Sequence, residues 1–257
     1  NVIDEVRMEF FTDGTAMFEA FTAGILSTMR ETSAQAWATN YDFPRVRAGE
    51  VVLAEVNHQR PSGMTGLVMN TRRDHFADWR VREAMIQAFP AEFINQTMNG
   101  GVDPRITSYF ANSPLAMQAG PATGRVDEFL DPFAADLLPG AREGYVMPVS
   151  DGSERNRAGI AAALAALEEA GFTVQNGVMT KPDGTPFTFD ILLQTGSAEN
   201  DAIINIYTEA LTRLGINVTV SRVDAAQFRE RRDVFDFDMV YERYGLSLNP
   251  GNEQYSY

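Results

Sequence analysis

One stretch, residues 66–89, constrains the fold more than any other part of the chain. It opens with the apolar run Leu67-Val68-Met69, which predicts a short buried strand. Asp78 then stands where a residue caps a helix, and apolar residues follow at helical spacing from Val81. A strand that passes through a charged turn into a capped amphipathic helix is half of an α/β unit. The turn itself, residues 72–75, fits either the wall of a ligand crevice or a solvated connection.

Residues 151–236 have the most regular pattern in the chain. A helical spacing follows a cap at Asp151 or Ser153, and Asn176-Gly177 predicts a tight hairpin. Strands and helices that alternate in this way are typical of an α/β domain. The further elements expected are strands at 187–193, 216–223 and 237–241, and helices at 203–214 and 225–231.

The first hundred residues predict shorter elements. Segments 51–56 and 66–71 flank a turn at Arg60-Pro61-Ser62-Gly63, so we expect them to pair as neighbouring strands. The other elements expected here are a strand at 6–11, helices that begin after Asp13 and Ser33, and a helix at 91–98.

Residues 100–150 differ from the rest of the chain because they contain half of its 12 prolines. Within them, only 126–130 and 132–138 have a helical pattern. Long ordered segments of this kind either cover a functional site or wrap around the fold. We interpret this one as an irregular, proline-rich wrap.

The charge of the chain argues against two classes of partner. It has 35 acidic and 21 basic residues, which gives a formal net charge of −14. Nucleic acids and anionic membranes both select basic surfaces, so we expect neither as a partner. A net charge of this size also opposes self-association, and we expect a monomer.

The chain offers few groups for metal or cofactor chemistry. It has no cysteine, which excludes cysteine-ligated metals and disulfides and fits an oxidising compartment. Its two histidines, His58 and His75, form no i, i+4 pair of the kind that binds zinc. Phosphate-binding Gly-Lys-Ser/Thr loops, dinucleotide fingerprints and Gly-x-Ser-x-Gly elbows do not occur. We therefore expect no metal, no cofactor and no catalytic residue.

Two acidic residues leave one enzymatic alternative open. Asp236 and Asp238 flank the start of the last strand, and a two-carboxylate hydrolase uses such a pair. They are the nearest candidates in the chain, but they do not stand at the end of a predicted strand, where apolar neighbours would raise the pKa of one carboxyl group. The alternative interpretation, that they mark the start of the strand and accept backbone amides, is the one we favour.

A polar stretch rich in glycine and proline follows the last strand. Residues 241–254, YERYGLSLNPGNEQ, carry two tyrosines, an arginine, two asparagines and a glutamine. Binding surfaces favour these side chains because they combine a large contact area with adaptable hydrogen bonds. The stretch is either such a surface or a polar hinge loop.

Four segments, taken together and in order, resemble family 5 of the extracellular solute-binding proteins, the peptide-binding components of ABC importers. The closest likeness is to the branch associated with murein-peptide and microcin C uptake, and it extends over all 257 residues. The segments are NTRRDHFADWRVREA (70–84), SYFANSPLA (108–116), DGSERNR (151–157) and FDFDMVYERYGLSLNPGNEQ (235–254).

The resemblance implies an α/β lobe of the type II periplasmic-binding-protein kind, with a mixed sheet flanked by helices. In such proteins the ligand is enclosed between two lobes that close about a hinge. Full-length relatives are about twice this length, so we expect that residues 1–257 are one lobe cut from a longer chain. Residues 1–12 and 237–257 would then be the segments that cross the hinge.

The resemblance also implies a function without catalysis. Such a protein binds peptides or peptide conjugates in the periplasm and delivers them to the membrane permease of an ABC importer. Arg72 or Arg243 could bind a ligand carboxylate bidentately, if the turns that carry them lie at the same end of the sheet. A ligand-sensing lobe of a regulator is a further alternative, although no basic helix-turn-helix occurs. The ligand-binding residues expected, at strand ends or in the turns after them, are Asn70, Arg72, Tyr241, Arg243, Tyr244 and Asn249.

The sequence departs from the family pattern at one position that bears on the ligand. Many peptide binders of the family have an Asp-Tyr pair after the last strand, and that Asp pairs with the free amino terminus of the ligand. The matching positions here are Leu246 and Ser247. Leucine cannot form a charge-assisted hydrogen bond with an ammonium group. The departure therefore suits a ligand that is blocked, branched, modified or anchored elsewhere.

Overall fold

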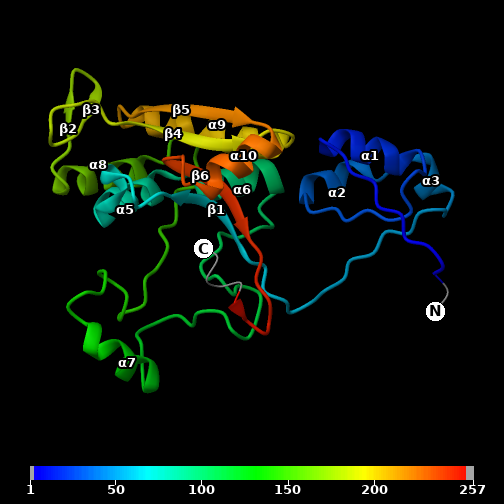
Figure 1. Cartoon of the computed structure of the whole chain (residues 1–257), viewed down its shortest axis with the longest axis horizontal. Coiled ribbons are helices and arrows are strands. Elements are labelled where there is room, and N and C mark those ends of the chain that lie inside the picture. The colour runs from blue at the N-terminus through cyan, green and yellow to red at the C-terminus, as the bar shows by residue number, and fades with distance from the viewer. Residues whose placement is uncertain (1–2, 253–257) are drawn as a thin grey trace.

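The computed structural model describes residues 3–252, and it has a larger and a smaller part joined by an extended segment (Figure 1). The smaller part contains α1 (Gly14–Thr22), α2 (Ala34–Asn40) and α3 (Pro44–Arg47). The larger part is built around a sheet that begins at Met64. The outermost residues of the predicted hinge-crossing segments, 1–2 and 253–257, lie outside the described residues. Within residues 3–252, no helix has the length and apolar character needed to cross a membrane.

The central sheet has four strands in the order β1-β6-β4-β5. The middle strand β4 (Thr188–Gln194) pairs in parallel with both β5 (Asn217–Val223) and β6 (Met239–Tyr244). The edge strand β1 (Met64–Met69) pairs antiparallel with β6. The sheet is therefore mixed, and the prediction of an α/β lobe with a mixed sheet is confirmed.

Helices cover both faces of this sheet. Successive side chains of β4 point to opposite sides, so both faces carry apolar side chains that need to be covered. Ile191 and Leu193 face the main core, where they pack with α5 (Trp79–Ala88), α8 (Arg157–Glu169) and α9 (Ala198–Arg213). The residue between them, Leu192, packs with Phe228 of α10 (Ala225–Asp233) on the other face. The remaining elements are α4 (Asp74–Ala77), α6 (Ala91–Asn99), α7 (Arg125–Leu130), a 3-10 turn (Asp131–Phe133), and the hairpin β2 (Thr173–Gln175) and β3 (Val178–Thr180).

Three helices begin where the sequence predicts a cap. The side chains of Asp13, Ser33 and Asp78 each accept a backbone amide at the start of α1, α2 and α5. The prediction for α8 is wrong, because its cap is Asn156 rather than Asp151 or Ser153. Asn156 is buried in the left-handed conformation, a conformation that asparagine adopts more readily than most residues.

The predicted strands at 6–11 and 51–56 are wrong, since neither segment forms a strand. Their apolar side chains are mostly exposed, so they have no sheet surface to pack against. The predicted pairing of 51–56 with 66–71 is wrong for a related reason: β6 pairs with β1. The helix predicted at 132–138 is reduced to the 3-10 turn, and the short helices α3 and α4 were not predicted.

Residues 100–150 are attached to the larger part near both ends of the segment. Arg105 donates to the carbonyl oxygens of Ile86 (3.2 Å) and Pro148 (2.8 Å), and the Tyr145 hydroxyl donates to Glu83 (2.8 Å). Between these attachments the chain extends away from the sheet and carries α7 (Figure 1). Its interpretation as a wrap stays a prediction.

Candidate functional site

The register of β1 and β6 divides the predicted site residues into two groups. Met69 pairs with Met239 and Met64 pairs with Tyr244, so the strands run in opposite directions. Asn70 and Arg72, which follow β1, therefore lie at the start of β6. The residues after Tyr241 lie at its other end, roughly 17 Å away for five steps of about 3.4 Å. The expectation that both groups share one crevice is wrong.

Asn70 holds the turn after β1 to the start of β6. Its side chain is only 4% exposed. Its Nδ2 donates to the carbonyl oxygens of Phe235 (3.1 Å) and Phe237 (2.8 Å), and its Oδ1 accepts the amide of Arg72 (3.1 Å). These bonds use both amide hydrogens on the protein itself. Ligand binding by Asn70 stays a prediction, and its observed contacts are structural.

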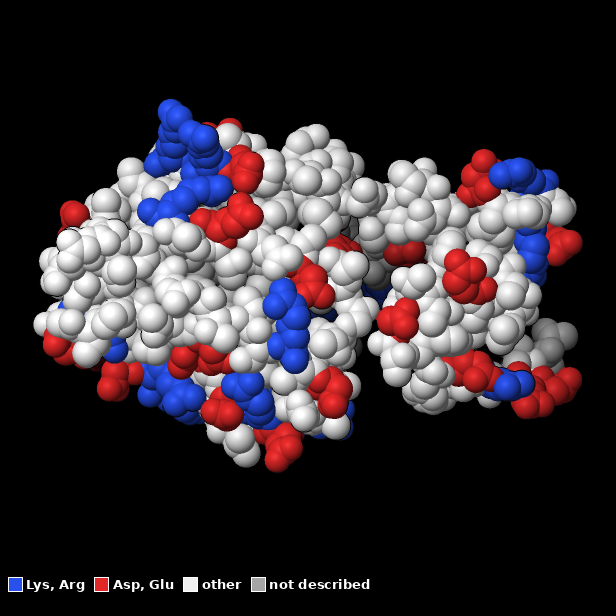
Figure 2. All heavy atoms as spheres, turned by 90° about the horizontal axis from the view of Figure 1, so that it is seen from above, with Lys and Arg blue, Asp and Glu red and all other residues white. Residues whose placement is uncertain are grey.

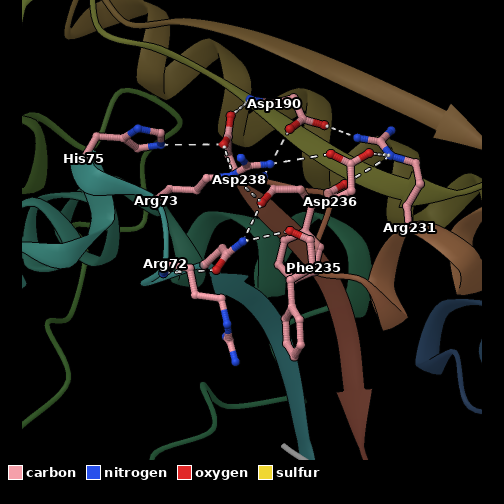
Figure 3. A network of polar contacts seen from close by, with 10 residues as sticks. Arg72, Arg73, His75, Asp190, Arg231, Phe235, Asp236 and Asp238 are labelled. Carbon is pink, nitrogen blue, oxygen red and sulfur yellow. Dashed lines mark hydrogen bonds and ion pairs between the residues drawn. The ribbon is translucent and has the colours of Figure 1, made fainter.

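Arg72 lies next to Asn70 but points outward (Figure 3). Its guanidinium stacks on the ring of Phe235, with Cζ 3.7 Å from the ring centroid. Phe235 has a positive φ of 57°, which is uncommon for a residue with a side chain. The pair forms an exposed cation–π contact at the start of β6.

A polar network joins β4 to the start of β6 at this same end of the sheet (Figure 3). The Asp238 carboxylate accepts the amide of Asp190 (2.9 Å) and pairs with Arg73 (3.1 Å). Asp236 pairs with Arg231 (3.0 Å) and with Arg73 (3.5 Å). Asp238 therefore accepts a backbone amide at the start of the strand, as predicted, whereas Asp236 forms ion pairs.

His75 lies next to Asp238 of this network and packs against aromatic rings. It packs on Phe76, Phe187 and Phe189 with centroid distances of 4.5, 5.7 and 6.3 Å. Its Nε2 is 3.9 Å from Asp238 Oδ1 and has no hydrogen-bond partner within residues 3–252. Burial lowers the pKa of His75, an effect that the Asp238 charge opposes. Burial therefore favours the neutral form of the imidazole.

A hollow of about 470 Å³ lies at the opposite end of the sheet, where β4 and β6 end. Tyr241 and Arg243 line it from β6, and Ser197 lines it from the turn before α9. Residues 9–14 of the smaller part close its other side. In α/β sheets, ligand crevices form outside the carboxyl ends of parallel strands. This hollow is therefore the best placed of the described surfaces to bind a ligand.

The two parts of the chain meet closely at this hollow. Gly196 has a φ of 110°, and a Cβ atom on it would lie 2.7 Å from the carbonyl oxygen of Thr12. A glycine is therefore needed both for the turn and for the approach of the smaller part. Thr195-Gly196-Ser197 begins two residues after the end of the strand predicted at 187–193, and that position was the available sequence signal for this turn.

The hollow carries charges of both signs. Among its lining residues, Glu9, Asp13 and Glu242 are acidic, and Arg243 supplies the positive charge. Acidic side chains flank the groove between the two parts (Figure 2). Burial and the charge of Glu199 raise the pKa of Tyr241, and burial raises the pKa of Glu199. The arrangement suits a ligand that carries both a positively and a negatively charged group.

The last two predicted site residues lie beyond the hollow. Tyr244 ends β6, and its carbonyl oxygen is so close to Gly63 that a Cβ there would lie at 2.3 Å. Asn249 is exposed, and its carbonyl oxygen accepts the Ser247 hydroxyl (2.9 Å). Within residues 3–252, no group of three or more acidic or histidine side chains is arranged so that it could hold a metal ion.

Comparison with known proteins identifies a family. The family described as "Bacterial extracellular solute-binding proteins, family 5 Middle" matches residues 1–257. The Brucella melitensis protein BMEII0691 is 38% identical over 256 residues, which are 99% of this chain and 41% of that protein. The peptidoglycan-binding protein YepA of Agrobacterium fabrum is 35% identical over 262 residues, covering 98% of this chain and 42% of YepA.

A solved structure has the same fold. The oligopeptide-binding protein AppA of Bacillus subtilis, in complex with a nonapeptide, gives a TM-score of 0.63 at 21% identity. The match covers 94% of this chain and 41% of AppA. The chain thus spans about two fifths of the length of the proteins that it matches.

Proposed function

Because the chain belongs to family 5 of the bacterial extracellular solute-binding proteins, we propose that it forms part of the substrate-binding component of an ABC importer. The whole protein binds its ligand in the periplasm as a monomer and delivers it to the membrane permease. It makes and breaks no bond, and its work is closure around the ligand.

The ligand that we propose is a peptide or a peptide conjugate. The relatives named peptidoglycan-binding YepA and probable peptide-binding YejA, both of Agrobacterium fabrum, support this class. The observation that carries it is the mixed charge of the hollow at the ends of β4 and β6. Arg243 would bind a ligand carboxylate, and the acidic residues around it would attract a positively charged side chain of the ligand rather than its amino terminus. Tyr241 would supply contact area beside them.

The carboxylates that raised the hydrolase alternative have other roles. Asp236 is paired with Arg231 and Arg73, and Asp238 holds the amide of Asp190. Both lie at the end of the sheet away from the hollow. No observation therefore favours an acid–base mechanism at this pair, and binding without catalysis is the function that we propose.

A thermal-shift screen of the full-length protein tests the proposal. The panel contains short peptides with free amino termini, the same peptides with blocked amino termini, and branched murein-type peptides. A ligand at 100 times its Kd stabilises the folded state by about 2.7 kcal/mol, which gives a measurable rise in Tm. We expect blocked or branched peptides to raise Tm, because Leu246 offers no charge to an ammonium group.

The other outcomes separate the parts of the proposal. A shift with free-amino-terminus peptides alone would keep peptide binding but contradict the role given to Leu246. No shift with any peptide would contradict peptide binding itself. The same screen with oligosaccharides and siderophore-type chelates would then identify the ligand class.

A further inference from the structure

A second hollow, of about 580 Å³, lies beside the segment that leaves β6. One wall is formed by residues 107–117 and the other by Leu246. Most of its lining is apolar, and the side chains of Tyr109, Leu115 and Met117 are 50, 46 and 52% exposed. Apolar side chains that gather around a hollow and stay exposed are typical of a binding site.

The wall formed by residues 107–117 is fixed in position by hydrogen bonds. The Ser108 hydroxyl accepts the amides of Phe110 (3.3 Å) and Met117 (2.9 Å), which closes the loop on itself. The side chain of Asn112 donates to the carbonyl oxygens of His58 and Arg60, both at 3.0 Å. A wall held in this way loses little conformational entropy when a ligand binds.

Lining residues of the two hollows lie close together along the chain. Arg243 lines the first hollow and Leu246, three residues later, lines the second. Three residues span at most about 10 Å. A peptide whose carboxylate lies at Arg243 would therefore bring a side chain to Leu246 within about three residues.

We propose that the hollow between residues 107–117 and Leu246 binds an aliphatic or aromatic side chain of the ligand. This inference rests on the proposed function, because the ligand must be a peptide whose charged end lies at Arg243. It predicts a preference for apolar side chains in the ligand, which the charged hollow does not provide. Leu246 then has a positive role, as part of an apolar wall.

Isothermal titration calorimetry on the full-length protein tests the inference. The probes are tetra-alanine peptides, amino-terminally blocked or free, in which one alanine at a time is replaced by leucine or by its polar isostere asparagine. Burial of a leucine side chain predicts a Kd about 10-fold lower for one leucine peptide than for its asparagine partner.

The variants Leu246→Asn and Met117→Gln alter the two walls separately. Each should reduce the leucine-to-asparagine preference several-fold while the Kd for the asparagine peptide changes little. Leu248→Asn is the matched control, because Leu248 is 45% exposed and lines neither hollow. It should keep the full preference. Thermal unfolding of each variant establishes that it is folded, and either wall variant is sufficient for the test.

Three results would overturn the inference. One is a wild-type protein that binds these peptides without preferring leucine at any position, which would leave the proposed function intact. Another is a preference that survives both wall variants. The third is an equal loss of affinity for the leucine and the asparagine peptides in the wall variants. That result is expected if another part of the longer protein fills the hollow. A wild-type protein that binds no peptide would instead contradict the proposed function.

Discussion

Asp190 and Asp238 exchange hydrogen bonds between neighbouring strands. The amide of Asp190 donates to Asp238 Oδ2 (2.9 Å), and the amide of Asp238 donates to Asp190 Oδ1 (3.1 Å). Arg231 pairs with Asp190 at 3.2 Å and Arg73 pairs with Asp238 at 3.1 Å, which offsets the repulsion between the two carboxylates. The reciprocal bonds lie directly before the parallel pairing of Ile191 with Met239, so they fix the register of β4 and β6.

We predict that Asp238→Ala lowers the free energy of unfolding by about 2–3 kcal/mol, because it removes the acceptor of a half-buried amide and of an arginine. Urea denaturation of the full-length protein measures this change. Asp233→Ala is the control, since Asp233 forms an exposed pair with Arg232. It should change stability by less than about 0.5 kcal/mol. Equal losses in the two variants would contradict the role of the reciprocal bonds.

His75 predicts a stability that depends on pH. Burial lowers its pKa from the ordinary value of 6.5; Asp238 and Asp74 act to raise it, and Lys181 and Arg73 to lower it. The unfolded chain therefore takes up a proton at a higher pH than the folded chain does. The stability that His75 contributes is fully present above pH 6.5 and is lost as the pH falls below it.

Substitution of His75 tests this prediction. Urea midpoints measured between pH 7.5 and 5.5 should fall for the wild-type protein, and His75→Gln should make that decrease smaller. The exposed His58 supplies the matched variant, His58→Gln, which should leave the slope unchanged. An identical slope in the wild-type protein and in His75→Gln would show that other groups cause the pH dependence.

The sequence predicts the local elements of this fold better than their pairing. Helices α1, α2 and α5 begin at the predicted caps, and β4, β5 and β6 form close to the predicted ranges. The partner of β1 was missed because Leu67 pairs with Tyr241, far along the chain. The turn at 60–63 favoured the segment 51–56 as the partner of β1. No local sequence pattern indicates that the distant strand β6 pairs with β1 instead.

The candidate site is predictable to a similar degree. Tyr241 and Arg243 do line a hollow at the end of two parallel strands. Arg72 was grouped with them because strand ends were recognised without their direction, and the antiparallel pairing reverses it. The acidic residues Glu9 and Asp13 were missed as site residues. With 35 acidic residues in the chain, composition does not distinguish those that face a ligand from those that face solvent.

The cap of α8 gives a prediction about a residue that the sequence pattern did not select. Asn156 Oδ1 accepts the amide of Gly159 (3.3 Å), and its Nδ2 donates to the carbonyl oxygen of Gln87 in α5 (3.0 Å). Asn156→Ala removes both bonds and places alanine in a left-handed conformation. We expect it to lower the free energy of unfolding by about 2–3 kcal/mol. Asp151→Ala, the cap expected from sequence, should have a much smaller effect; the reverse order of the two urea midpoints would contradict this assignment.

The two arginines at opposite ends of β6 give the last prediction. If Arg243 binds the carboxylate of a peptide, Arg243→Gln should raise the Kd of a free-acid peptide at least about 10-fold, since a charge-assisted hydrogen bond is lost. The same variant should bind the amidated peptide with nearly unchanged affinity, because the amide carries no charge to lose. Arg72→Gln removes a charge of the same sign from the other end of the sheet, where the guanidinium stacks on Phe235. It should leave both affinities unchanged. Calorimetry of the wild-type protein and both variants with each of the two peptides gives one double-substitution cycle for each arginine. A coupling that appears for Arg72 and not for Arg243 would move the carboxylate site to the start of β6.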